Sequence, residues 1–202
     1  MNTKAFKIGV IGAGTMGNGI AHVFSLYNFK VLLVDINDKI IDCALKNIKH
    51  NMERQLKKNI IDTKQMSNAL SNIETSNNLK EMSNCSLIIE AIKEDFNIKS
   101  NIFKQLDQVC NKKTILCSNT SSISINKLAE CTLRQDKIIG MHFMNPVPIM
   151  KLVEVINGKN TSKETSQCII EIAKVINKIP IQCNDSPGFV SNRILMPMIN
   201  EA

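Results

Sequence analysis

One histidine and one glutamate interrupt two otherwise apolar runs of this chain. His142 lies in "GMHFMN", and Glu154 follows twelve positions later in "KLVEVI". A carboxylate beside one imidazole nitrogen fixes the tautomer and stabilises the protonated ring, which leaves the other nitrogen free to exchange a proton near neutral pH. The pair is therefore a candidate for general acid–base catalysis. The alternative interpretation is a core histidine whose hydrogen bonds serve packing alone.

The stretch "GAGTMG" has the pattern G-x-G-x-x-G. It follows a predicted strand at 6–11 and opens a predicted helix at 15–28, and the next predicted strand, 30–35, ends in Asp35. In this context the loop N–H groups and the helix N-terminus typically bind a pyrophosphate, while the acidic residue binds the ribose hydroxyls. We expect the cofactor-binding residues to be Gly12, Ala13, Gly14, Thr15, Met16, Gly17 and Asp35. The charge of Asp35 would repel a 2′-phosphate, so NAD is favoured over NADP. A structural glycine turn is the alternative.

Strand and helix signals alternate along the rest of the chain. We expect further strands at 85–92, 114–119, 137–143, 150–156 and 179–183, with helices from residue 37, through 98–106 and near 163–176. This alternation predicts an α/β, Rossmann-type fold with a doubly wound, largely parallel sheet. His142 would lie at the carboxyl end of its strand, where such sheets bind ligands. The turn at 145–148 would return the chain and bring Glu154 back toward His142. Beside a nicotinamide, this pair fits a dehydrogenase, because hydride loss from an alcohol accompanies loss of its hydroxyl proton.

Composition narrows the class of protein. Of the 202 residues, 44% are hydrophobic and 21% charged, which is ordinary for a soluble globular protein, and we expect no membrane association. The net charge of +7 is spread along the chain and aromatic residues make up only 4%, so an anionic nucleotide is a better partner than nucleic acid. None of the seven cysteines forms a C-x-x-C pair, so we expect no metal site and reduced thiols in a cytoplasmic protein.

Five segments together resemble a known family. They are "GAGTMGNGIA", "EAIKE", "SNTSS", "GMHFMNPVPIMKLVEV" and "DSPGFVSNRILMPMINEA". In this order they are similar to the signature segments of the 3-hydroxyacyl-CoA dehydrogenase family, including bacterial 3-hydroxybutyryl-CoA dehydrogenases. The resemblance covers essentially the whole chain. It implies an NAD-dependent oxidoreductase that interconverts an (S)-3-hydroxyacyl-CoA, with a short acyl chain, and the corresponding 3-oxoacyl-CoA.

The resemblance also implies roles for individual residues. His142 would be the catalytic base and Glu154 its partner, while Ser121 and Asn192 would hydrogen-bond the reacting oxygen of the acyl-CoA. The implied NAD contacts are Glu94, Lys99, Ser121 and Asn145, and the implied CoA contacts are Ser121 and Lys58. A solvated charged helix face is the alternative for Lys58. Ser121 and Asn192 depend on the resemblance, because serine and asparagine are also common in turns.

The resemblance divides the chain into an NAD-binding domain at 1–185 and the first helix of a C-terminal helical domain at 186–202. Family members continue past this point into a domain that closes over the active site and forms a homodimer. We therefore expect a truncated C-terminal domain here, for which a homodimer is doubtful. Two alternatives stay open. One is a related NAD-dependent hydroxy-acid or sugar-acid dehydrogenase that does not use CoA, and the other is a non-catalytic NAD-binding fragment.

Overall fold

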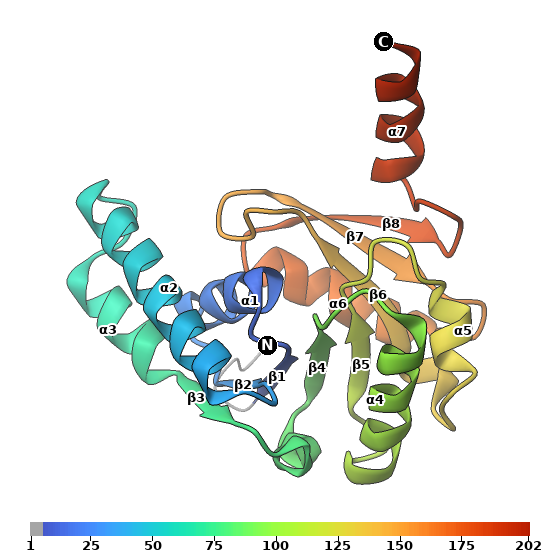
Figure 1. Cartoon of the computed structure of the whole chain (residues 1–202), viewed down its shortest axis with the longest axis horizontal. Coiled ribbons are helices and arrows are strands. Elements are labelled where there is room, and N and C mark those ends of the chain that lie inside the picture. The colour runs from blue at the N-terminus through green and yellow to red at the C-terminus, as the bar shows by residue number, and fades with distance from the viewer. Residues whose placement is uncertain (1–5) are drawn as a thin grey trace.

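The computed structural model of this protein describes residues 6–202 and arranges most of them around a single sheet (Figure 1). The strands are β1 (Ile8–Ile11), β2 (Val31–Val34), β3 (Ile73–Ser76), β4 (Leu87–Glu90), β5 (Ile115–Ser118), β6 (Ile138–Phe143), β7 (Leu152–Asn157) and β8 (Ile179–Asn184). The α-helices are α1 (Thr15–Leu26), α2 (Asp38–Lys57), α3 (Thr63–Ser71), α4 (Phe96–Val109), α5 (Ile125–Ala129), α6 (Lys163–Val175) and α7 (Ser191–Glu201), and short 3-10 helices are η2 (Leu79–Asn84) and η3 (Gln135–Lys137).

The described strands lie in the order β3-β2-β1-β4-β5-β6-β7-β8. All neighbours from β3 across to β6 are parallel, β7 runs antiparallel to β6, and β8 is parallel to β7. The predicted doubly wound and largely parallel sheet is therefore confirmed. Chain order reverses between β1 and β4, and ligands of such sheets bind at the carboxyl ends of the strands beside this reversal.

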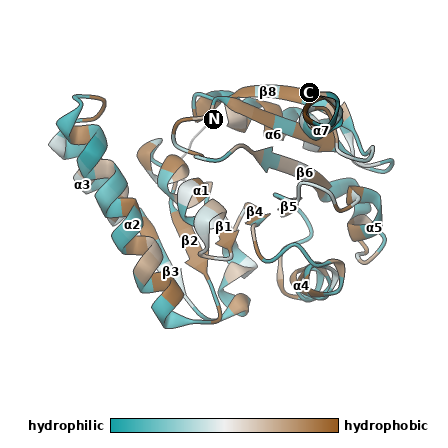
Figure 2. Ribbon diagram, turned by 45° about the horizontal axis from the view of Figure 1, so that its top comes forward, coloured by the Kyte–Doolittle hydropathy of each residue, from teal (hydrophilic) through white to brown (hydrophobic). Residues whose placement is uncertain are grey.

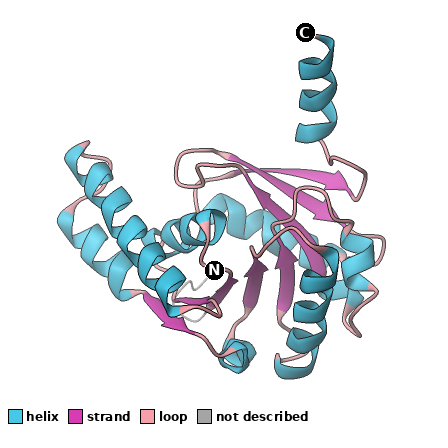
Figure 3. Ribbon diagram, viewed as in Figure 1, coloured by secondary structure: helices cyan, strands magenta, loops and turns pink. Residues whose placement is uncertain are grey.

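Helices cover both faces of the sheet (Figure 3). In β2, Val31 and Leu33 pack on one face with residues of α1, α2 and α6, whereas Leu32 and Val34 pack on the other face with residues of α4 and α5. Strand residues that are apolar on both faces explain the continuous hydrophobic runs in the sequence. Figure 2 shows apolar ribbon in β1 and β2 and alternating polar and apolar stretches along α2.

The sequence-based prediction lacked α3, β3, the short helix α5 and the 3-10 helices η2 and η3. Strand β3 reads "IETS", and its residues are half-buried or exposed at one edge of the sheet. An edge strand with polar side chains carries little of the apolar signal by which the other strands were predicted. Most of the predicted strands were slightly too long: the run expected at 85–92 forms strand only from Leu87 to Glu90, whereas β8 extends one residue beyond the expected 179–183.

Helix α7 projects away from the sheet, as Figure 1 shows at the red end of the chain. Its exposed side chains include Ile194, Leu195, Met198 and Ile199. The expected helical pattern after residue 186 is thus present, while its assignment to a separate C-terminal domain stays a prediction. Between residues 6 and 202, none of the helices combines the length and apolar character needed to cross a bilayer.

Candidate active site

The antiparallel pairing of β6 and β7 brings the histidine and the glutamate together. His142 and Glu154 are direct partners across the two strands, and Nδ1 of the imidazole lies 2.7 Å from Oε2 of the carboxylate. Both residues are buried, with the glutamate only 1% exposed. The prediction that the turn at 145–148 returns Glu154 to His142 is confirmed.

Both oxygens of the Glu154 carboxylate have donors. Oε2 faces His142, and Oε1 accepts the backbone N–H groups of Val190 at 3.0 Å and Ser191 at 2.7 Å. Burial alone would raise the pKa of Glu154, but the hydrogen bonds from His142 and from these N–H groups lower it overall. The carboxylate is therefore ionised at neutral pH and holds the proton of the ring on Nδ1. Nε2, which accepts no hydrogen bond from residues 6–202, can then take a proton.

The glycine loop between β1 and α1 fits a bound phosphate. Gly12 has φ +94°, and a Cβ there would lie 2.7 Å from the carbonyl oxygen of Ala91. A Cβ at Gly17 would lie 1.6 Å from the carbonyl oxygen of Gly12, so the helix can approach the loop only without a side chain. A Cβ at Gly14 would meet nothing within 4 Å, and no side chain in the described part of the chain caps α1 there. The N–H groups at Thr15 and Met16 are thus open to an anion.

A cleft of about 630 Å³ adjoins this loop and contains Asp35 in its wall. One carboxylate oxygen of Asp35 accepts the N–H of Ala13 at 2.8 Å, which ties the tip of β2 to the glycine loop. Each carboxylate oxygen has two acceptor sites, so the side chain can still bind hydroxyl groups. The other walls are mostly apolar and include Ile36, Ile40, Leu79, Ile92, Ile98 and Ile102. An apolar cleft with one acidic residue beside a phosphate-binding loop suits the adenosine half of a dinucleotide.

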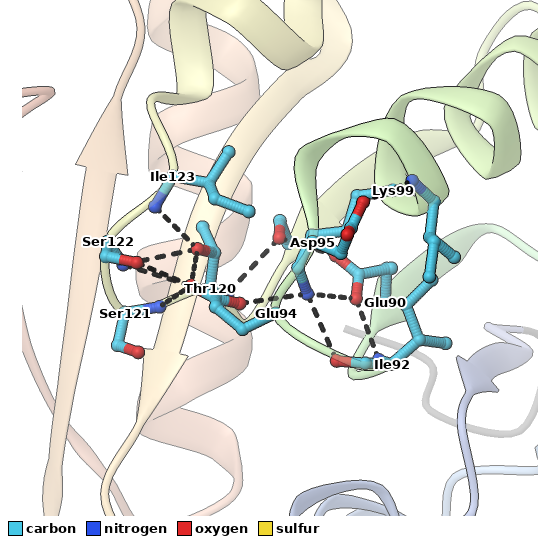
Figure 4. Close-up of polar contacts among 11 residues, drawn as sticks. Glu90, Ile92, Glu94, Asp95, Lys99, Thr120, Ser121, Ser122 and Ile123 are labelled. Carbon is cyan, nitrogen blue, oxygen red and sulfur yellow. Dashed lines mark hydrogen bonds and ion pairs between the residues drawn. The ribbon is translucent and has the colours of Figure 1, made fainter.

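The loop after β5 is organised by Glu94, which follows β4 (Figure 4). One oxygen of Glu94 accepts the backbone N–H groups of Ser121 at 3.1 Å and Ser122 at 3.2 Å, and also the hydroxyl of Thr120. Its other oxygen lies 3.2 Å from Nζ of Lys99. Burial raises the pKa of Glu94, but the Thr120 hydroxyl and the charge of Lys99 outweigh it, so the pKa is lowered. The structure thus brings together Glu94, Lys99 and Ser121.

Asn192 reaches the same loop from α7. Its side-chain amide donates to the carbonyl oxygen of Ser121 at 3.4 Å. Asn145 is exposed in the turn after β6, two residues beyond Phe143. The loop after β5 is also linked to β6, the strand of His142, because the N–H of Phe143 donates to the side chain of Asn119 at 2.9 Å.

Residues 7–186 match the family model described as "3-hydroxyacyl-CoA dehydrogenase, NAD binding domain". The chain belongs to this dehydrogenase family. It is 47% identical over 196 residues to the 3-hydroxybutyryl-CoA dehydrogenase of Clostridioides difficile, an alignment that covers 97% of this chain and 70% of that protein. It is 39% identical over 199 residues to the mitochondrial hydroxyacyl-coenzyme A dehydrogenase of Homo sapiens, covering 96% of this chain and 63% of that protein. The crystal structure of (S)-3-hydroxybutyryl-CoA dehydrogenase from Ralstonia eutropha aligns with a TM-score of 0.95 at 42% identity, over 98% of this chain and 70% of that chain.

NAD is the cofactor of this 3-hydroxyacyl-CoA dehydrogenase family member, as the glycine loop and Asp35 predicted. Lys58, the predicted CoA contact, is exposed at the end of α2. In Figure 1 the tip between α2 and α3 lies on the opposite side of the molecule from α7. The structure therefore does not bring Lys58 together with His142, and its contact with CoA stays a prediction.

Three residues of the candidate site were not identified from the sequence. Glu90, Thr120 and Ser122 complete the hydrogen bonds around Glu94 and Lys99. Glu90 had a signal, since it is an acidic residue at the end of an apolar run, as Asp35 is. Thr120 and Ser122 had none beyond a polar loop. The predicted contact of Lys99 with NAD also stays a prediction, and the structure places its ammonium group beside Glu90, 1% exposed.

Proposed function

We propose that this chain catalyses the NAD-dependent interconversion of an (S)-3-hydroxyacyl-CoA and the corresponding 3-oxoacyl-CoA, with a preference for short acyl chains. The family match and the names of the relatives support the reaction and the substrate class. The observation that carries the proposal is the buried His142–Glu154 pair, at the carboxyl end of β6 in a fold whose carboxyl edge also holds the NAD-binding loop.

The dyad supplies the proton chemistry of this reaction. In the oxidative direction Nε2 of His142 takes the proton of the substrate hydroxyl, and in the reductive direction the protonated ring returns it to the carbonyl oxygen. Glu154 stabilises the protonated ring through Nδ1. NAD, when bound, accepts or supplies the hydride. Ser121 and Asn192 hold the reacting oxygen beside His142, which follows from the family resemblance.

Turnover of two substrates tests the proposal. Purified chain should oxidise NADH with acetoacetyl-CoA and show little or no oxidation with free acetoacetate, followed by NADH absorbance. His142→Gln should lower the rate by about a hundredfold or more, because it removes the proton carrier, and should leave NADH affinity unchanged. His50→Gln, on the exposed side of α2, is the matched control and should retain the wild-type rate.

Other results would favour the alternatives. Equal rates with acetoacetyl-CoA and acetoacetate would favour a dehydrogenase that does not use CoA. NADH binding by calorimetry without turnover, even at high protein concentration, would favour an NAD-binding chain that is not catalytic by itself. A fully active His142→Gln variant would exclude the proposed mechanism.

A further inference from the structure

A lysine and a glutamate are buried together next to the cofactor cleft, and neither forms part of its wall. The Lys99 side chain is 1% exposed and that of Glu90 is 0% exposed, with Nζ 2.5 Å from Oε1. Nζ also donates to the carbonyl oxygen of Ile92 at 3.2 Å, and the other oxygen of Glu90 accepts the hydroxyl of Ser118 at 2.6 Å. A buried ion pair is costly unless such additional hydrogen bonds satisfy it, so this pair is held in one geometry.

The pair is connected to the cofactor side of the site through one partly exposed carboxylate. Nζ of Lys99 lies 3.2 Å from Oε2 of Glu94, whose side chain is 38% exposed. Through Oε1, Glu94 accepts the N–H groups of Ser121 and Ser122. Figure 4 shows the contacts in sequence, from Glu90 through Lys99 and Glu94 to the loop after β5.

We propose that the buried Glu90–Lys99 pair is a positioning device for the cofactor site, which fixes Glu94 and through it the backbone of the loop at 120–122. Two carboxylates share one ammonium group in this cluster. Glu90 neutralises Lys99 at the closer distance, and Glu94 keeps the net negative charge. Because an ionised carboxylate accepts stronger hydrogen bonds than a neutral one, this charge holds the loop N–H groups. In this arrangement Lys99 acts on the loop through Glu94.

The charge-neutral double variant Glu90→Gln/Lys99→Met tests this assignment. Replacing both partners avoids an unpaired buried charge, so we expect the fold to persist. Without the ammonium group, Glu94 is free to move, and the amide hydrogens of Ser121 and Ser122 should exchange about tenfold faster with solvent in the cofactor-free protein. The NADH dissociation constant should rise by about the same factor. A pair that serves only stability would leave both quantities at the wild-type value in the folded double variant.

Two further variants complete the test. Glu94→Gln alters only the partly exposed carboxylate and should reproduce the faster exchange, and adding it to the double variant should add little. Lys7→Met/Glu74→Gln is the control: it removes an exposed ion pair of 2.7 Å elsewhere on the chain and should leave the exchange rates of the Ser121 and Ser122 amide hydrogens unchanged.

Unchanged amide exchange in the folded double variant overturns the proposal, as does unchanged exchange in Glu94→Gln should the double variant fail to fold. The inference rests on the proposed NAD site for its effect on affinity. If the wild type bound no NADH, the proposed function would fail, while the amide exchange would still decide this inference.

Discussion

His142 and Glu154 show how much of the site can be predicted residue by residue. Their types and their isolation in apolar runs identified them, and the structure pairs them at 2.7 Å. The second role of Glu154 was not predictable. It accepts the N–H groups of Val190 and Ser191, and backbone donors leave no trace in a sequence because every residue except proline carries one. One carboxylate thus orients the imidazole and holds the start of α7.

His22 should make the stability of the fold depend on pH. It is fully buried in α1, with Nε2 3.0 Å from the side chain of Gln55. Burial lowers its pKa to about 4. In the unfolded chain His22 binds a proton near pH 6.5, whereas in the folded chain it stays neutral down to about pH 4. This residue therefore lowers the stability of the fold as pH falls from about 6.5 toward 4. Between pH 7 and pH 5 its contribution to the free energy of unfolding should fall by about 2 kcal/mol.

Urea unfolding at the two pH values measures this effect. His22→Gln should lose less stability on acidification than the wild type, while His50→Gln, an exposed control, should behave like the wild type. The same pH dependence in His22→Gln and in the wild type would contradict the assignment.

At the level of elements, the parallel strands place the glycine loop and the His142–Glu154 pair on the same side of the sheet, at the carboxyl ends of the strands. The glycine loop follows β1, Glu94 follows β4, the loop at 120–122 follows β5, and His142 lies near the carboxyl end of β6. Periodicity predicted these strands because they are apolar on both faces. It missed β3 because an edge strand with polar side chains resembles a loop.

The glycine loop allows a prediction with an internal control. Gly17→Ala should destabilise the fold, because its Cβ would overlap the carbonyl oxygen of Gly12 at 1.6 Å. Gly14→Ala should leave stability nearly unchanged, because its Cβ would meet no atom within 4 Å. However, its methyl group would enter the space open to a phosphate and weaken NADH binding. Thermal unfolding and NADH titration of both variants check this, and an unimpaired NADH affinity in Gly14→Ala would argue against the phosphate site.

At the level of the whole molecule, cofactor binding should be visible as stability. A ligand that binds only the folded state at a concentration one hundred times its dissociation constant adds about 2.7 kcal/mol. For a chain of this size, that raises the Tm by about 5–10 °C. NADPH should raise the Tm less than NADH, because Asp35 in the cleft repels a 2′-phosphate.

The variant Asp35→Asn separates charge from shape in this comparison. An asparagine oxygen can still accept the N–H of Ala13, so the loop should keep its form while the repulsion disappears. The difference in Tm between NADH and NADPH should then narrow. If the wild type were stabilised equally by both cofactors, Asp35 would not select between them.

The fold class, the glycine loop, the His142–Glu154 pair and the family could all be predicted from local patterns in the chain: apolar periodicity, fixed glycine spacing and short motifs. Apart from this pair, the contacts between polar groups became evident only in the folded structure. Three of these contacts join residues that lie 9 to 37 positions apart in the sequence. They are the buried Glu90–Lys99 pair, the hydrogen bond from the N–H of Ser121 to Glu94, and the hydrogen bond from the N–H of Ser191 to Glu154. Such contacts are set by sheet order and strand register. These in turn arise from packing the apolar faces of all elements at once, which no single stretch of sequence encodes.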